Sequence, residues 1–389
     1  MPRDYAEFRL SSNVFSTFLV IGCYVPFLPV WLQGRGLNAD QIGMIFAAAL
    51  WAKIPVGLLI SSLADHSGQR KWLLLAIAGA TLAGFLSFPL LDGFTAILIG
   101  WIFVGTLLTT MIPLSDSLAV TAIRRFDLNY GRIRRWGSIS FIGVSIIGGA
   151  WLDGRDSEAV LSLLIATSAV MVISTVTLPD LREQPRPGRR PALFDLIRSP
   201  TFMIFVVTAA TLQASHAALY GFATLQWVAA GISKTVIGLL WAEGVLVEIG
   251  LLTFASAVLR HVGVPRLLML AGVAGIVRWS VLGTTSWLPA LVAVQALHAL
   301  TFAGTLVAAI GFISKTVPAD QSATAQGLYD GLAMGLIFGF AMAIAGRAYA
   351  DSGAAVFYVM AALSAGGVAG AVLLQICLRQ TRPGRPQQL

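Results

Sequence analysis

The sequence predicts an all-α membrane protein of twelve transmembrane helices arranged in two pseudo-symmetric six-helix bundles. Two observations carry this prediction: an apolar composition and an internal repeat. Of the 389 residues, 57% are hydrophobic and only 11% are charged, and the mean hydropathy is +0.81. So few charges cannot cover the surface of a water-soluble domain of this length. The composition therefore excludes a soluble globular protein.

Twelve apolar stretches come close to the roughly 20 residues that a helix needs to cross a bilayer. The fifth of them is short for a crossing. They cover residues 8–33, 39–63, 72–91, 95–121, 136–153, 159–179, 200–228, 235–258, 266–285, 287–313, 322–348 and 354–378.

The first half of the chain returns in the second half at an offset of 195 residues. Residues 36–43 (GLNADQIG) align without a gap on residues 231–238 (GISKTVIG), and the same offset places Gly68 on Gly263. It also places Lys53 on Glu248, two ionisable residues inside apolar stretches. A parallel repeat of apolar helices with opposite charges at equivalent depth is typical of a transporter made of two similar bundles.

Basic residues fix the expected orientation. With the N-terminus inside, twenty Lys and Arg fall on the inner side and four on the outer side, while two more lie within spans. The positive-inside rule then places both termini in the cytoplasm of a multi-pass inner-membrane protein. The net charge of +8 is accordingly a topology signal, and no nucleic-acid partner is expected.

The main polar stretch between spans follows the sixth one and is rich in Pro and Arg. Such a segment indicates a semi-flexible tether, with an amphipathic piece around residues 193–197. The expected division is an N-terminal bundle (residues 1–181), a cytoplasmic linker (182–199), a C-terminal bundle (200–379) and a cytoplasmic tail (380–389). The two cysteines, Cys23 and Cys377, suggest neither a disulfide nor a metal site.

The loop after the second span reads DHSGQRK at residues 65–71. It resembles the signature of the major facilitator superfamily, although Ser61 stands where that signature has a glycine. The resemblance implies a cytoplasmic gate formed by Asp65, Gly68 and Arg70.

Rare polar residues at fixed points in several regions make a narrower resemblance, to the phenylpropionate permease family. It implies a proton symporter for an aromatic acid or a related organic anion. It rests on residues 113–119 (PLSDSLA), 130–138 (YGRIRRWGS), 215–222 (SHAALYGF), 240–248 (LWAEGVLVE), 277–279 (VRW) and 294–298 (VQALH).

Ionisable groups at bilayer depth are costly, by roughly 2.5–3.5 kcal/mol on insertion scales, so they face a cavity or a partner. Helical spacing adds polar neighbours, because residues three, four and seven apart share one face. In the superfamily that the chain resembles, the first, fourth, seventh and tenth helices line the central cavity. The candidates are Lys53, Asp116, Gln213, His216, Tyr220, Trp241, Glu248, Arg278, Gln295 and His298.

We expect Glu248 to couple transport to protons, because burial disfavours a charged carboxylate and so favours protonation. His216 or His298 would relay the proton, and Asp116 is a further proton-coupling candidate. Lys53 or Arg278 would attract the substrate anion. Tyr220, Trp241, Gln213 and Gln295 would contact the rest of the substrate. The structural alternative is that the charged residues form salt bridges between helices.

The sequence predicts secondary active uptake by a functional monomer, with the proton gradient as energy source and no cofactor. Exporters of the superfamily commonly carry Gly-Pro ahead of a Gly-Gly pair in the fifth helix. Here no proline precedes Gly148 and Gly149, which favours uptake. An efflux antiporter and a nucleoside or sugar symporter remain alternatives. An enzyme is disfavoured, because the chain has no HExxH, GxSxG or Cys-His cluster.

Overall fold

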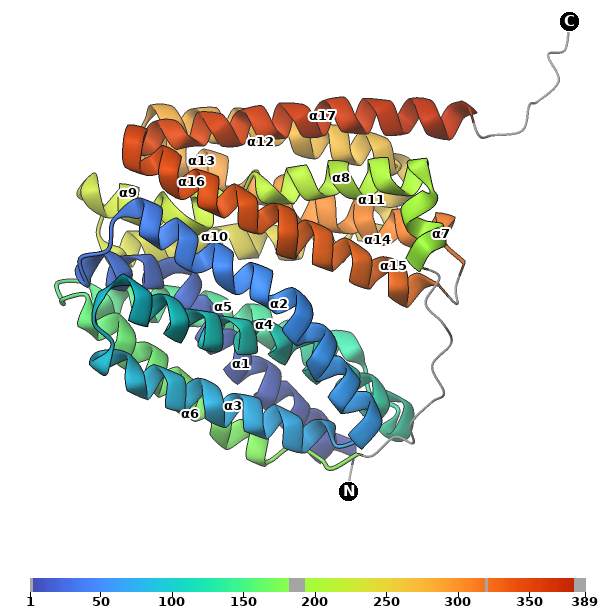
Figure 1. Cartoon of the computed structure of the whole chain (residues 1–389). Helices are drawn as coiled ribbons and strands as arrows, with labels where there is room; N and C mark the ends of the chain where they lie inside the picture. The colour runs from blue at the N-terminus through green and yellow to red at the C-terminus, as the bar shows by residue number, and fades with distance from the viewer. Residues whose placement is uncertain (1–2, 182–192, 319–320, 381–389) are drawn as a thin grey trace, which may run out of the picture. The chain divides into compact units, whose positions relative to one another are not determined.

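The computed structural model describes residues 3–181, 193–318 and 321–380. Its helices form two compact units. The first unit comprises Met1–Gly188, Ala218–Leu246 and Met342–Ala354, and the second comprises Arg189–Ala217, Val247–Ala341 and Ala355–Leu389. Figure 1 colours the helices in chain order.

The first part of the chain forms six long helices. They are α1 (Arg3–Gly34), α2 (Ala39–Ser67), α3 (Arg70–Ser87), α4 (Gly93–Phe126), α5 (Tyr130–Leu152) and α6 (Glu158–Val176), with the 3-10 helix η1 (Phe88–Leu90) before α4. In this unit α1 packs on α5 and α6, α2 on α4, and α3 on both α4 and α6.

The remaining described residues form shorter and more interrupted helices. The α-helices are α7 (Leu193–Arg198), α8 (Pro200–Ala214), α9 (Thr224–Ala229), α10 (Lys234–Thr253), α11 (Ala255–His261), α12 (Val264–Thr284), α13 (Leu288–Gln295), α14 (Thr305–Thr316), α15 (Ser322–Tyr329), α16 (Phe338–Ser352) and α17 (Val356–Gln380). Three π-helices, η2 (Leu219–Ala223), η3 (Ala299–Gly304) and η4 (Asp330–Ile337), and the 3-10 helix η5 (Gly353–Ala355) complete the order.

Ten segments of the described residues are long and apolar enough to cross a membrane. The segment 322–380 contains the last two expected spans, and α5 coincides with the fifth. Helix α5 begins at Tyr130, six residues before the expected start, because the Asn129 side chain caps it by accepting from the Arg132 amide. The arrangement fits twelve spans, and that count stays a prediction.

The 195-residue repeat has a backbone counterpart at two pairs of glycines. Gly36 and its repeat mate Gly231 have φ angles of 79° and 81°, and Gly68 and Gly263 have 63° and 78°. These left-handed values favour glycine because it has no Cβ atom. The repeat therefore preserves the turns before and after the second helix of each half.

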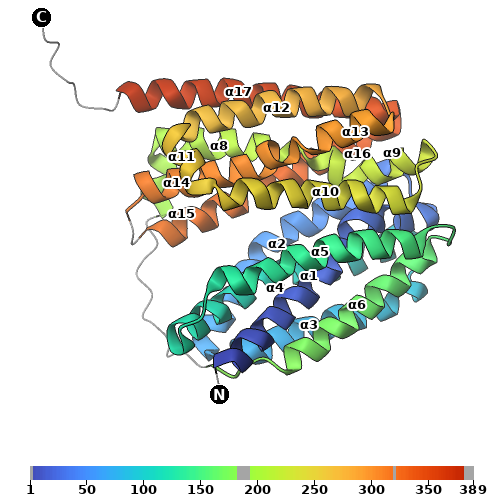
Figure 2. The same cartoon turned by 180° about the vertical axis from the view of Figure 1, so that it is seen from behind.

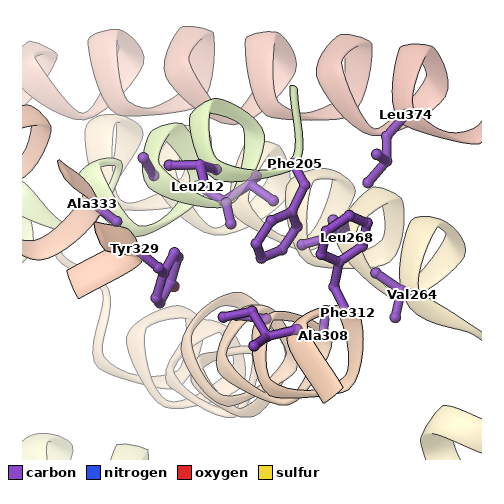
Figure 3. Close-up of a cluster of buried hydrophobic side chains, with 14 of the residues drawn as sticks. Phe205, Leu212, Val264, Leu268, Ala308, Phe312, Tyr329, Ala333 and Leu374 are labelled. Atoms are coloured by element: carbon purple, nitrogen blue, oxygen red, sulfur yellow. The ribbon is translucent and has the colours of Figure 1, made fainter. Parts of the chain in front are cut away.

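The core of the second unit is a cluster of buried side chains from α8, α12, α14, α15 and α17 (Figure 3). Phe205 stacks on Phe312 with ring centroids 4.0 Å apart, and Tyr329 lies 6.0 Å from Phe205. Helices α12 and α17 run side by side in both overall views (Figures 1 and 2), and both contribute side chains to this cluster. The α12 residues of this cluster, Val264 to Ala271, lie on the same helix as Arg278 and end about two turns before it.

The domain boundaries expected from the sequence stay a prediction. Residues 182–192 of the expected linker lie outside the described residues. The expected amphipathic piece coincides with α7, which the structure assigns to Leu193–Arg198.

Candidate functional site

Arg278 is the centre of a buried polar cluster in the second unit. It projects from α12 and is 0% exposed. Its Nη2 atom donates to Gln295 Oε1 over 2.6 Å, and its Nη1 atom lies 3.0 Å from both His298 Nδ1 and Thr301 Oγ1. The planar guanidinium suits this arrangement, since its N–H groups point along fixed directions.

Two helix interruptions position the partners of Arg278. Helix α8 ends at Ala214 and is followed by a turn at Ser215 and His216, and α13 ends at Gln295 and is followed by a turn just before His298. A π-helix follows each turn, η2 after the first and η3 after the second. Such π segments within helices occur frequently at functional sites.

The two interruptions carry the same short motif, Gln-Ala-x-His-Ala, at residues 213–217 and 295–299. The sequence analysis identified the Gln and His of each motif but missed that the motif repeats. The two imidazole rings meet edge to face, with centroids 5.7 Å apart. This repeated motif is visible in the sequence, and it would have predicted that the two segments contribute equivalent groups to one site.

Trp279 holds the first interruption in place. Its indole N–H lies 3.1 Å from the hydroxyls of both Ser215 and Ser364. Its ring lies 4.6 Å from the Arg278 Cζ atom, a cation–π distance. His216 meets the same ring edge to face at 5.1 Å.

Glu248 approaches the cluster from α10. Its Oε2 atom lies 3.8 Å from His298 Nε2, and its side chain is 19% exposed. The structure thus brings together six of the ten residues predicted for coupling and binding. They are Gln213, His216, Glu248, Arg278, Gln295 and His298, joined by Thr301, which the sequence analysis missed.

The other four predicted residues belong to the first unit. Tyr220 and Trp241 stack on one another with centroids 5.8 Å apart, and the Trp241 indole donates to Thr224 over 3.1 Å. Lys53 is half-buried on α2. This unit therefore contains the predicted aromatic pair and the second predicted cation.

Asp116 is paired within the first unit. It accepts a hydrogen bond from the Tyr130 hydroxyl and lies in the field of Arg134. The Arg134 guanidinium in turn lies over the Phe18 ring, 4.3 Å from its centroid. Tyr130 and Arg134 were not singled out individually from the sequence, although both fall in the segment 130–138 that carries the family resemblance.

The predicted gate residues adopt the geometry of a capped helix end. Gly68 terminates α2 in a left-handed conformation, and its amide donates to the Ala64 carbonyl. Asp65 Oδ1 lies 3.5 Å from Arg70 Nη2, with Asp65 exposed and Arg70 buried. Their part in gating stays a prediction.

A second buried polar cluster, around Asn13, was not predicted. The Asn13 amide donates to Thr175 Oγ1 and accepts from Ser115 Oγ, both over 2.9 Å. Ser16 and Ser174 lie 2.5 Å apart beside it. The cluster joins α1, α4 and α6 and satisfies its hydrogen bonds internally, which indicates a structural role.

Comparison with known proteins identifies the chain. The model of the MFS_1 like family matches residues 8–360. The chain belongs to this family. An MFS_1-like protein is a membrane transporter rather than an enzyme, and the fold of the chain agrees with that assignment.

Curated relatives of this MFS_1-like chain are transporters. A probable 3-phenylpropionic acid transporter from Escherichia coli (strain K12) is 30% identical, covering 90% of this chain and 93% of the relative. A maltose permease from Geobacillus stearothermophilus is 25% identical, covering 83% and 82%. A crystal structure of the nucleoside transporter NupG superposes with a TM-score of 0.86 at 16% identity, covering 95% and 99%. The last comparison shows the fold alone.

Proposed function

We propose that this transporter takes up a small organic acid, with an aromatic acid as the first candidate, by proton symport and alternating access. It would reside in the inner membrane as a functional monomer with both termini in the cytoplasm. Glu248 would carry the coupling proton, and Arg278 would supply the positive charge for the substrate carboxylate. The proposal draws its substrate class from the Escherichia coli relative.

The proposal rests on the arrangement of three side chains in a row, with His298 between Arg278 and Glu248. An imidazole separates a buried guanidinium from a carboxylate, with contacts of 3.0 and 3.8 Å. In this arrangement an ionised Glu248 supplies negative charge to the Arg278 side of the cluster. Protonation of Glu248 removes that charge, and a substrate carboxylate can then take its place without leaving net charge in the low-dielectric interior.

A sugar or nucleoside symporter is the second candidate. Gln213 and Gln295 are neutral amides in the same cluster, of the kind that bind hydroxyl-rich ligands. The maltose permease at 25% identity and a putative nucleoside transporter from Escherichia coli (strain K12) at 24% identity support this alternative.

The proposal is tested in proteoliposomes with an imposed pH gradient, inside alkaline. We expect accumulation of labelled 3-phenylpropionate that collapses with a protonophore. Benzoate, a nucleoside and maltose are the comparators. Accumulation of a nucleoside or maltose alone would reject the organic acid and favour the second candidate. Loss of a preloaded compound in place of uptake would indicate an exporter.

Glu248→Gln tests the coupling role. The variant should lose pH-driven accumulation but retain exchange of labelled for unlabelled substrate, because exchange needs no net proton movement. Glu243→Gln is the matched control, since Glu243 lies on the same helix five residues away. Wild-type accumulation by Glu248→Gln would contradict the assignment.

A further inference from the structure

We propose that His216 and His298 are positioning residues, held neutral in opposite tautomers by Arg278 and Thr301, and that neither imidazole carries the transported proton. The tautomer assignment rests on hydrogen-bond geometry alone. Its consequence for coupling rests on the proposed proton symport.

The tautomer of His298 follows from Arg278. A guanidinium can only donate hydrogen bonds, so the His298 Nδ1 atom, 3.0 Å from Nη1, must accept with its lone pair. A neutral ring then carries its proton on Nε2. That atom lies 3.8 Å from Glu248 Oε2, so the N–H group faces the carboxylate. A protonated His298 would place an N–H against the Arg278 N–H and break the bond.

The tautomer of His216 follows from a backbone carbonyl. Its Nδ1 atom lies 3.1 Å from the Gln213 carbonyl oxygen, which can only accept, so Nδ1 carries a proton. The Nε2 atom lies 3.1 Å from the Thr301 hydroxyl. In a neutral ring Nε2 accepts from that hydroxyl. The two histidines of the repeated motif therefore have opposite tautomers.

Thr301 links the two assignments. Its oxygen accepts from Arg278 Nη1 over 3.0 Å, and its hydroxyl proton has two acceptors within reach, the His216 Nε2 atom at 3.1 Å and the His298 carbonyl oxygen at 3.4 Å. We assign the proton to the nearer acceptor, His216 Nε2.

Two chains of contacts therefore begin at the Arg278 guanidinium, and in each chain every group donates to the next one. The first leads through Thr301 and His216 to the Gln213 carbonyl. The second leads through His298 towards Glu248. With both rings neutral, each donor and acceptor of the first chain has a partner, and the His298 N–H group of the second chain faces Glu248 at 3.8 Å.

A second positive charge at His216 is disfavoured by the same geometry. Arg278 and His216 are both 0% exposed and approach the same Thr301 oxygen. Two unit charges about 6 Å apart repel by roughly 3 kcal/mol at an effective dielectric constant of about 20. Burial away from water adds to that cost.

Charged and titratable groups reach the cluster from α12, α10 and α15 and from the two interruptions, which makes five helical segments. Arg278 lies on α12, Glu248 on α10 and Tyr329 on α15, while each imidazole faces the other from the two interruptions. Helix α17 contributes the neutral Ser364 hydroxyl, which binds Trp279. Among the described residues, Arg278 contacts the His298 ring directly and reaches the His216 ring through the Thr301 hydroxyl.

A proton on Glu248 has no free position to enter on His298. The facing Nε2 atom already carries a proton, and the lone pair on Nδ1 is engaged by Arg278. Proton exchange at Glu248 would then take place with water or substrate, without passing through an imidazole. His298 would act by holding its N–H group towards Glu248, in the orientation that its bond to Arg278 fixes.

The direct test is ¹⁵N NMR of histidine-labelled protein in lipid nanodiscs. The chain has four histidines, and His66→Gln with His261→Gln removes the two exposed ones. We expect two neutral rings, one protonated on Nδ1 and one on Nε2, unchanged from mildly acidic to mildly alkaline buffer. His298→Asn should remove the Nε2-protonated ring. An imidazolium signal within this range, or two identical tautomers, would overturn the proposal.

The transport test separates positioning from proton carrying. In His298→Asn the amide oxygen can still accept from Arg278, but the donor to Glu248 is lost. We expect KM for uptake to rise roughly threefold, less than the loss of a full hydrogen bond would give because the N–H group faces Glu248 at 3.8 Å, with pH-driven accumulation retained at saturating substrate. A proton carrier would instead behave like Glu248→Gln, with exchange retained and accumulation lost.

Thr301→Val and Thr301→Ser form a matched pair for the second chain. Valine keeps the shape but cannot donate to His216, whereas serine keeps the hydroxyl. We expect the NMR signal of the Nδ1-protonated ring to shift in Thr301→Val and to stay in place in Thr301→Ser. Equal shifts in both variants would refute the role of the hydroxyl. If wild-type protein accumulates no substrate, the proposed function fails while the tautomer assignment is still decided by NMR.

Discussion

Gly43 and Gly346 bring two helices into backbone contact, because a Cβ atom on Gly43 would lie 2.7 Å from the Gly346 Cα atom. The repeat mate of Gly43 makes a contact of the same kind. A Cβ atom on Gly238 would collide with the Ser145 carbonyl oxygen, and one on Gly149 would lie 2.5 Å from the Lys234 carbonyl oxygen. The pairs α2 with α16 and α5 with α10 thus depend on glycine in equivalent positions.

We predict that Gly43→Ala and Gly238→Ala each destabilise the protein by about 1–3 kcal/mol and reduce uptake, because the neighbouring atoms are backbone and cannot move aside. The measurements are thermal unfolding in detergent and initial uptake rate. Gly57→Ala on α2 and Gly250→Ala on α10 are matched controls, since a Cβ atom there meets nothing within 4 Å. Equal effects at all four positions would contradict the close-contact explanation.

Arg278→Lys should abolish most uptake although it keeps the charge. A lysine ammonium cannot reach the three acceptors that the guanidinium contacts. Each lost charged hydrogen bond is worth about 1.5–3 kcal/mol, so we expect uptake efficiency to fall at least ~100-fold. The control is Arg347→Lys, at an exposed pair with Asp351, which should leave uptake near the wild-type rate. Wild-type uptake by Arg278→Lys would show that the guanidinium geometry is not used.

The fold could be predicted from the sequence because lipid leaves few alternatives. In the bilayer each backbone polar group must find a partner, so a long apolar stretch forms a helix. The polar cluster was also predictable in outline, because Glu248 and Arg278 stand out in apolar surroundings. The position of Glu248 and Arg278 within apolar stretches did not indicate which side chains they contact.

The helix interruptions could not be predicted from hydropathy. At the first interruption the Gln213 carbonyl accepts from both the amide and the Nδ1 atom of His216, and the Trp279 indole binds the Ser215 hydroxyl in the turn. Trp279 comes from a helix more than sixty residues away in sequence. A local pattern carries no information on such a partner, whereas the repeated Gln-Ala-x-His-Ala motif would have indicated that the two sites are related.

Asn13→Leu should destabilise the first unit by about 1–3 kcal/mol. The substitution leaves the buried Ser115 hydroxyl without its acceptor and removes the donor to Thr175. Thermal unfolding in detergent measures the effect. Ser12→Ala is the matched control one residue away, because the Ser12 hydroxyl binds only the Phe8 carbonyl of its own helix and should be close to neutral. A stable Asn13→Leu variant would mean that the neighbouring hydroxyls find other partners.

Asp153 is the last residue of the expected fifth span, but α5 ends at Leu152 and Asp153 is exposed just beyond it. We expect this carboxyl to make a pH-dependent contribution to stability. It joins α5 to the start of α10, since it accepts from the Thr235 hydroxyl over 2.8 Å and from the Lys234 amide over 3.3 Å. The Thr235 bond, supported by the Lys234 amide, holds the pKa of the Asp153 carboxyl below its ordinary value. A carboxyl with a lowered pKa stabilises the folded state above the pKa that it has in the unfolded chain. That contribution is lost as the pH falls through the lower, folded-state pKa.

We therefore expect Thr235→Val to melt at a lower temperature than wild type at neutral pH, and the difference to disappear in acid below about pH 4, the ordinary range of an aspartate. Thr235→Ser keeps the hydroxyl and should follow the wild-type curve. The measurement is the melting temperature in detergent as a function of pH for the three proteins. A difference that persists unchanged in acid would assign the effect to the second methyl group that valine places where the hydroxyl was, because the ionised carboxylate would then contribute nothing to it.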